Sequence, residues 1–287
     1  MSTLPPASKL VLGTAAIGLD YGRAHADGQP ARKPDDRELL ALLKAVRGLG
    51  VHCYDTAPVY GDAEQRLGRL LQRRERVWTK LDPGLHPAAS LEGSCARLQR
   101  RPVDLLQWHS WSAGLLHDNV FLDSWSELVH LGDASAFGAS TYGADDALEA
   151  VDCGCFSVLQ VEWNLLDQHV IAAVGPKART RKVQLAVRSV WLQGLLAGRQ
   201  PPNAGLAAAV QRAGALAQRL QRPLPALALQ AALEHPQIDH VLIGCDRAEQ
   251  VAVVHQALKA PPLDTEAWQA IWQLHVGPPA TDPRTWA

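Results

Sequence analysis

Short apolar runs alternate along this chain with longer segments in which apolar residues recur at the period of a helix. The run Val51–Tyr54 is typical of a buried strand, and Asp55 follows it directly. Residues 35–50 instead carry a single apolar stripe, which predicts a helix. The stripe consists of Leu39, Leu42, Leu43, Val46 and Leu49.

The same pattern predicts eight strands with helices between them. The predicted strands are 9–14, 51–54, 76–79, 103–108, 136–139, 157–161, 182–187 and 240–243. The predicted helices are 35–50, 63–71, 87–100, 120–131, 144–151, 205–221, 225–234, 247–258 and 264–275. Alternation of this kind implies a parallel sheet that is covered by helices.

Eight such units favour a closed (β/α)8 TIM barrel of the α/β class, forming a single domain over residues 1–287. The alternative is an open doubly wound sheet. The open sheet is less favoured because the nucleotide-binding fingerprint G-x-G-x-x-G does not follow the first strand. Residues from about 277 to 287 are rich in proline, and we expect them to form a loosely held tail.

Composition excludes several classes of partner. Of the 287 residues 47% are hydrophobic, which is ample for a large core. The net charge of −1 gives no basic excess for nucleic acid or an anionic membrane. We see neither a secretory signal nor an apolar run approaching the roughly 18 residues of a membrane span, so we expect a cytoplasmic protein.

The cysteines give no sign of a disulfide framework or a metal site. There are five, at positions 53, 95, 153, 155 and 245, an odd and scattered set. Cys153 and Cys155 form the only close pair, and they lack the second ligand pair of a zinc site. We expect free thiols and no bound metal.

Candidate chemistry gathers at the ends of consecutive predicted strands. Asp55 and Tyr60 follow the second strand, Lys80 the third and His109 the fourth. In a barrel these positions share one rim. An ammonium favours the phenolate of a neighbouring tyrosine, a carboxylate can hold the lysine, and a histidine can orient a carbonyl oxygen. Each residue alone has an ordinary structural explanation, but the combination points to proton transfer at a carbonyl group.

These residues belong to a longer set of motifs, and with them the chain resembles the aldo-keto reductases over nearly its whole length. The motifs are Leu12-Gly13-Thr14, Asp55-Thr56-Ala57-x-x-Tyr60-Gly61-x-x-Glu64, Thr79-Lys80, Val103-Asp104-Leu105-Leu106-Gln107-Trp108-His109, Phe137-Gly138-Ala139-Ser140, Gln160-Val161-x-x-Asn164 and Ile243-Gly244 with Glu249-Gln250. The resemblance implies a (β/α)8 barrel that binds a nicotinamide cofactor without a Rossmann domain. It also implies a catalytic tetrad of Asp55, Tyr60, Lys80 and His109, in which Tyr60 protonates a carbonyl oxygen that receives a hydride.

The resemblance further implies the cofactor contacts. These are Gly13, Thr14, Ser140, Thr141, Gln160, Arg188, Ser189, Gln193, Gly194, Gly244, Arg247 and Gln250. Thr141 replaces the usual asparagine, and Arg188 stands where many members place an aromatic ring. Asp246 lies beside Arg247, where a carboxylate would repel the 2′-phosphate of NADP. We expect NADP(H) as the cofactor, with NAD(H) possible.

The substrate is expected to be a small carbonyl or alcohol compound. Tyr21, Trp111 and Trp191 are the candidate pocket residues. The segments 18–22 and 164–168 resemble a branch of the family found beside bacterial sugar and polysaccharide biosynthesis genes, which favours a sugar-like substrate. The sequence leaves open a monomer or a small homo-oligomer. Two other functions also stay open: a cofactor-binding regulatory subunit without turnover, and a Schiff-base lyase that uses Lys80 as nucleophile.

Overall fold

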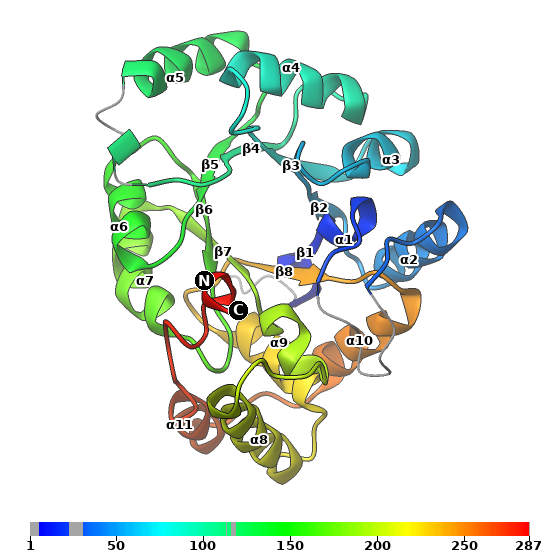
Figure 1. Ribbon diagram of the computed structural model, residues 1–287, viewed down its shortest axis with the longest axis vertical. Helices are drawn as coiled ribbons and strands as arrows, with labels where there is room; N and C mark the ends of the chain where they lie inside the picture. Colours follow the sequence, from blue (N-terminus) through cyan, green and yellow to red (C-terminus); the bar gives the residue numbers. More distant parts are fainter. Residues whose placement is uncertain (1–5, 23–30, 113, 116–118, 287) are drawn as a thin grey trace.

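The computed structural model describes residues 6–22, 31–112, 114–115 and 119–286, and it confirms the predicted barrel. Eight parallel strands close into a ring in which each strand pairs with the next and β8 pairs with β1 (Figure 1). The strands are β1 (Leu10–Gly13), β2 (Cys53–Asp55), β3 (Arg76–Lys80), β4 (Leu105–Trp108), β5 (Phe137–Ser140), β6 (Val158–Glu162), β7 (Gln184–Arg188) and β8 (His240–Gly244).

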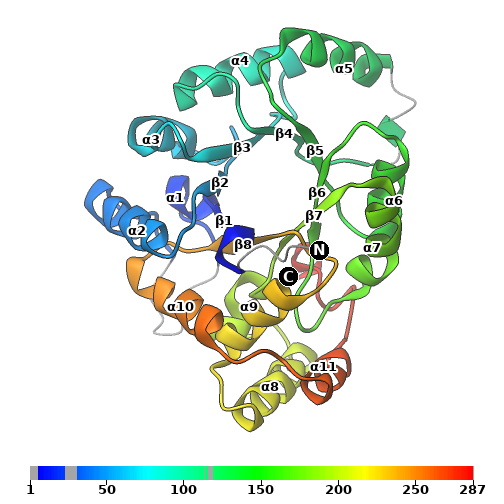
Figure 2. The ribbon, with the colours of Figure 1, turned by 180° about the vertical axis from the view of Figure 1, so that it is seen from behind.

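The helices surround this ring, as both views show (Figures 1 and 2). They are α1 (Ala15–Gly18), α2 (Asp36–Gly48), α3 (Ala63–Leu70), α4 (Pro87–Leu98), α5 (Asn119–Leu131), α6 (Ala144–Asp152), α7 (His169–Arg181), α8 (Ala204–Arg219), α9 (Leu224–Glu234), α10 (Val251–Lys259) and α11 (Thr265–Trp272). Helix α2 begins with a reciprocal cap, because the Asp35 side chain accepts from Glu38 N and the Glu38 side chain accepts from Asp35 N.

Two helices escaped the sequence prediction. Helix α1 is a single turn, too short to show a period. Helix α7 contains Gly175 and Pro176, which read as breakers in the sequence. It forms nonetheless because Val170, Ile171 and Val174 bury one helical face together with Gly175 and Ala178.

Strand side chains fill the inside of the barrel. A small apolar cluster draws one residue from each of seven strands. Its members are Val11, Cys53, Trp78, Leu105, Val158, Ala186 and Leu242. The larger cluster joins the outer faces of the strands to the helices. The barrel is therefore a packed core, and its functional groups have to come from the rim.

The end of the described chain is held in place, unlike the loose tail that the sequence suggested. The backbone N–H groups of Val276 and Gly277 both donate to the carbonyl of Leu166. The Thr281 hydroxyl donates to the buried Asp167, and Trp286 packs against the core. In Figure 1 this red segment leaves α11 and returns across the barrel toward β7.

In the part of the chain that the structure describes, no helix combines the length and the apolar character that a membrane crossing requires.

Candidate active site

The strand ends bring the four predicted catalytic side chains together at one rim of the barrel. Asp55 and Lys80 end β2 and β3, and His109 follows β4. Oδ2 of Asp55 lies 2.6 Å from Nζ of Lys80, and this Nζ lies 5.1 Å from the ring centre of Tyr60. The rings of Tyr60 and His109 meet edge to face with their centres 5.8 Å apart. One contiguous cluster therefore contains all four residues.

Lys80 and Asp55 form a buried ion pair. Both residues are at most 2% exposed, and Nζ of Lys80 also donates to the carbonyl of Thr56 at 2.9 Å. Burial is the largest influence and opposes the charge of the lysine, but the interactions with Asp55 and Tyr60 together outweigh it and raise the pKa of Lys80 above its ordinary value. The ammonium beside Tyr60 therefore stays charged at neutral pH.

Tyr60 keeps its proton at neutral pH. Burial raises the pKa of its phenol, and the charge of Lys80 opposes this shift without reversing it. The sequence argument gave the lysine the correct direction of influence but did not include the burial of the ring. A protonated phenol beside a fixed ammonium is suited to donating a proton, because the ammonium stabilises the phenolate that remains.

His109 is neutral in this environment. Burial, together with the nearby charge of Lys80, lowers the pKa of its imidazole to about 4. Its buried Nδ1 has no hydrogen-bond partner among the described residues. A neutral imidazole keeps one N–H donor, which suits it to bind a carbonyl oxygen without giving up a proton.

Two glycines fix the loop that carries Tyr60. A Cβ atom on Gly18 would lie 1.9 Å from the carbonyl oxygen of Tyr60, and a Cβ on Gly61 would lie 2.3 Å from the carbonyl oxygen of Gly18. Gly61 also has a φ of 58°, in the left-handed region. Helix α1 therefore touches the Tyr60 loop backbone to backbone, which leaves no room for a side chain at either glycine.

A cavity of about 540 Å³ opens beside the four side chains. Most of the predicted cofactor and substrate residues line it. These are Gly13, Thr14, Tyr21, Ser140, Gln160, Arg188, Ser189, Trp191, Gln193, Gly194, Gly244 and Gln250. Tyr21 is half-exposed at this site, and the indole of Trp191 donates to the carbonyl of Pro225.

Three predicted residues lie outside the cavity wall. Trp111 was expected in the substrate pocket, but it is 2% exposed and stacks edge to face on Phe156, so it belongs to the core. The side chain of Thr141 is buried, and its carbonyl accepts from Arg188. Arg247 lies at the entry to α10, where its backbone N–H donates to the Gln250 side chain.

Arg199 lines the cavity and was missed in the sequence. Its side chain passes over Gly194 and reaches Gly22, where added Cβ atoms would lie 2.4 and 2.5 Å from it. Burial lowers the pKa of its guanidinium, yet an arginine remains charged at neutral pH. The two glycines that make room for it were visible in the sequence, but nothing there linked them to position 199.

Arg199 follows a contorted segment between β7 and α8. Non-glycine residues with left-handed backbone occur at Ser189 (φ 65°), Leu192 (φ 45°) and Gln193 (φ 51°). Gly194 and Gly198 continue the series with φ values of 90° and 96°. Strained backbone of this kind persists where the surrounding structure imposes it and is concentrated at ligand sites. The segment forms much of the cavity wall.

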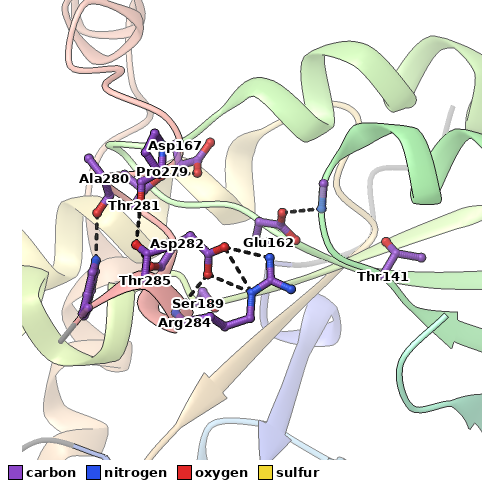
Figure 3. Close-up of polar contacts among 12 residues, drawn as sticks. Thr141, Glu162, Asp167, Ser189, Pro279, Ala280, Thr281, Asp282, Arg284 and Thr285 are labelled. Atoms are coloured by element: carbon purple, nitrogen blue, oxygen red, sulfur yellow. Dashed lines mark hydrogen bonds and ion pairs between the residues drawn. The ribbon is translucent and has the colours of Figure 1, made fainter. Parts of the chain in front are cut away.

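The C-terminal segment completes the wall on the side of β6 and β7 (Figure 3). The Arg284 guanidinium lies 3.9 Å from the ring centre of Tyr142 and is paired with Asp282. The Arg188 guanidinium lies 4.2 Å from the same ring centre and 3.3 Å from Glu162. Tyr142 thus stacks with two arginines, each of which is paired with a carboxylate.

The residues present fit a nicotinamide dinucleotide. Gln160 offers an amide beside the catalytic cluster, as a carboxamide requires, and Arg199 offers a guanidinium of the kind that binds phosphate. Gly13 and Gly244 at the ends of β1 and β8 leave their backbone accessible to a ligand.

Comparison with known proteins places the chain in a family. The model of the family described as "Aldo/keto reductase family" matches residues 9–275 of the chain. The chain is 28% identical to the D-threo-aldose 1-dehydrogenase of a Pseudomonas species (91% of this chain, 95% of the relative). It is 27% identical to the NADH-specific methylglyoxal reductase of Escherichia coli K12 (91% and 92%). An aldo-keto reductase structure from Bacillus halodurans in its holo form shares the fold, with a TM-score of 0.73, 24% identity and coverage of 93% and 91%. This protein belongs to the aldo/keto reductase family.

Proposed function

We propose that this protein is an NAD(P)H-dependent oxidoreductase that interconverts a carbonyl compound and the corresponding alcohol, with Tyr60 as general acid and base. One observation carries the proposal. The phenol of Tyr60, the buried Lys80–Asp55 pair and the neutral His109 meet at the wall of one cavity. That set supplies a proton donor, the charge that stabilises its conjugate base, and a group that orients the oxygen.

We propose a role for each of these residues on the basis of this geometry. The bound cofactor, when reduced, supplies a hydride to the carbonyl carbon. His109 donates a hydrogen bond to the carbonyl oxygen and holds it toward Tyr60. As negative charge develops on that oxygen, Tyr60 transfers its phenolic proton, and Lys80 stabilises the phenolate. Asp55 holds the ammonium in place throughout, and the same groups act in reverse when the alcohol is oxidised.

A sugar-like or other polar carbonyl compound is the proposed substrate class. Two arginines, Arg188 and Arg284, line the cavity near β7, and their guanidinium groups can donate hydrogen bonds to the hydroxyl groups of a substrate. The names of two relatives indicate that one acts on an aldose and the other on methylglyoxal. Both substrates are small polar carbonyl compounds. The resemblance to the branch near sugar biosynthesis genes also favours a sugar-like substrate.

The cavity wall bears on the choice between NADP(H) and NAD(H). Arg199 supports either cofactor, because both contain a pyrophosphate. Asp246 lines the cavity, whereas Arg247, the residue expected to bind the 2′-phosphate, does not. A carboxylate disfavours a phosphate and can accept from a ribose hydroxyl. This arrangement moves our proposal from NADP(H) toward NAD(H).

A cofactor titration followed by turnover tests the proposal. NADH and NADPH are titrated separately into the purified protein while its tryptophan fluorescence is recorded. A panel of aldoses, 2-oxoaldehydes and simple aldehydes is then added, and oxidation of the cofactor is followed by absorbance. We expect turnover in the wild type, a loss of at least about 100-fold in kcat for Tyr60→Phe and unchanged cofactor affinity. Cofactor binding without oxidation by any substrate would instead support a regulatory subunit.

The structure disfavours the alternative that this protein is a Schiff-base lyase. A nucleophilic lysine needs a depressed pKa, whereas Lys80 is held as an ammonium by Asp55. Borohydride treatment in the presence of substrate is therefore expected to leave Lys80 unmodified. We propose further that the protein acts in the cytoplasm as a monomer or small homo-oligomer, which sedimentation analysis can determine.

A further inference from the structure

A buried glutamine joins the Lys80–Asp55 pair to the amide that lines the cavity. Gln107 lies in β4, two residues before His109, and is 0% exposed. Its Nε2 donates to Oδ1 of Asp55 at 2.8 Å, and its Oε1 accepts from Nε2 of Gln160 at 3.1 Å. Nε2 of Gln160 also donates to Oδ1 of Asp55 at 3.0 Å. The three side chains form a closed triangle of hydrogen bonds inside the barrel.

The carboxylate fixes the direction of this triangle. An ionised carboxylate only accepts hydrogen bonds, so both glutamines must turn their NH₂ groups toward Asp55. Gln107 therefore presents its carbonyl oxygen to Gln160, which occupies the second hydrogen of the Gln160 NH₂ group. The carbonyl oxygen of Gln160 is then the atom with which this side chain can accept from a ligand in the cavity.

We propose that Gln107 is a positioning residue that orients Asp55 toward Lys80 and sets Gln160 as an acceptor for the cofactor carboxamide. The inference rests on the proposed function, because it assigns the Gln160 oxygen to that ligand. Gln107 lies outside the cavity wall and acts through its two neighbours. Without it, Oδ1 of Asp55 loses one of two buried donors, and the Gln160 amide loses one of the two acceptors that hold its orientation.

The variant Gln107→Glu gives the sharpest test, because a glutamate has the same shape and its behaviour depends on pH. A protonated glutamate donates from its hydroxyl to Asp55 and accepts from Gln160, as the glutamine does. An ionised glutamate puts a second negative charge against Oδ1 of Asp55. Burial and that like charge raise the pKa of the new carboxyl group, so acidic pH keeps it protonated.

The measurement is the dissociation constant for NADH and for NADPH, taken by tryptophan quenching from pH 5.5 to 9. At pH 5.5 we expect the affinity of Gln107→Glu to match that of the wild type. It should fall relative to the wild type by about tenfold or more as pH rises, the usual cost of disrupting a buried hydrogen bond to a charged group. Where turnover is measurable, the ratio of kcat values should show the same dependence.

Two further variants separate positioning from stability. Gln107→Leu removes the donor and the acceptor together, and we expect about tenfold weaker cofactor binding at every pH. Gln230→Leu is the matched control, since Gln230 is likewise buried, at 2% exposed, but bonds to Arg222 and Glu234, away from the cavity. Its thermal midpoint is expected to fall while its cofactor affinity stays unchanged.

The outcomes distinguish the inference from the function on which it rests. A wild type that binds neither cofactor contradicts the proposed function. A wild type that binds and turns over, with a Gln107→Glu ratio that does not change with pH, overturns the role of Gln107. If Gln107→Leu fails to fold, the Gln107→Glu profile still decides the matter.

Discussion

The two sides of the barrel rim are built in different ways. On the side of β2 to β4, Asp55, Lys80 and His109 lie on strand ends or one residue beyond. Short buried contacts hold Asp55 and Lys80 in place. On the side of β6 to β8, the cavity wall comes from the contorted segment 189–199 and from the C-terminal residues Pro283 and Arg284. The first side places reactive groups in a fixed geometry. The second side is built from loop segments whose side chains can vary, as ligand recognition requires.

This difference suggests a division of work. Strand ends cannot shift without disturbing the whole sheet, so the Lys80 ammonium and its partner Asp55 stay in register. Loops and a returning tail can change from one relative to another at little cost to the barrel. Substitutions on the two sides should therefore have different signatures, in catalysis and stability on the first and in affinity on the second.

Replacing Lys80 by methionine should give the largest effect. It leaves the Asp55 carboxylate buried without its cation, which costs about 3–5 kcal/mol in unfolding free energy. It also removes the charge that stabilises the Tyr60 phenolate, so kcat should fall by about 100-fold or more. Urea unfolding and steady-state rates measure the two effects. The control Lys177→Met breaks an exposed pair with Asp152 and should cost at most about 1 kcal/mol. Equal losses in both variants would contradict a special role for the buried pair.

Acid should weaken the barrel before it weakens the tail contact between Asp282 and Arg284. His240 is buried, and His109 and His235 are partly buried. Burial lowers the pKa of each imidazole to about 4, below the value of about 6.5 in an unfolded chain. The unfolded chain takes up protons first, so the free energy of unfolding should fall as pH drops from 6.5 toward 4. The hydrogen bond to Arg284 lowers the pKa of Asp282 below its ordinary value of 3.8. The Asp282 carboxylate therefore keeps its pair with Arg284 at every pH above that value.

Urea unfolding at pH 7, 5.5 and 4.5 measures this difference. The wild type and Arg284→Ala should lose the same stability across the range. His109→Gln should lose less, because one of the three histidines is gone. If His109→Gln lost as much as the wild type, burial of that imidazole would not be what limits acid stability.

On the recognition side, Arg199→Ala should weaken cofactor binding by about tenfold, the usual cost of losing a charged hydrogen bond to phosphate. The expected loss is similar for NADH and NADPH, since the pyrophosphate is common to both. Fluorescence titration measures it, and Arg219→Ala, an exposed arginine of α8, is the control. A loss confined to NADPH would place Arg199 at the 2′-phosphate instead.

The smallest effect is expected at the tail. Arg284 is exposed, and its pair with Asp282 contributes at most about 1 kcal/mol. Arg284→Ala should raise KM for the carbonyl substrate by about threefold and leave kcat and cofactor affinity unchanged, a loss within that range. Arg181→Ala, an exposed arginine of α7, should change neither constant. A large drop in kcat for Arg284→Ala would move the tail from recognition into chemistry.

The strand side of the site could be predicted from the sequence, and the other side only in part. The end of a strand in a parallel barrel has one location, so positions 55, 80 and 109 could be placed on a common rim without coordinates. Helix α7 was missed because Gly175 and Pro176 hid a continuous apolar face.

The hydrophobic periodicity of the sequence does not predict contacts between residues that are far apart in the chain. Nothing local indicates that Arg199 passes over Gly194 to Gly22, or that residue 284 returns to residue 142. Trp111 was placed in the pocket because it follows His109 closely, yet it turns into the core against Phe156. The burial of Tyr60 likewise depends on packing that a sequence pattern does not contain.

The return of the tail to the cavity has a practical consequence for handling the protein. A peptide tag fused after Ala287 would begin two positions beyond Trp286, whose indole donates to the carbonyl of Ala280 within the segment that contributes to the cavity wall. The described chain begins before β1, at the end of the barrel away from the cavity, where Nζ of Lys9 donates to the carbonyls of Leu233 and Ile238. Binding constants and rates are therefore best taken from material that is tagged at the amino terminus or not at all.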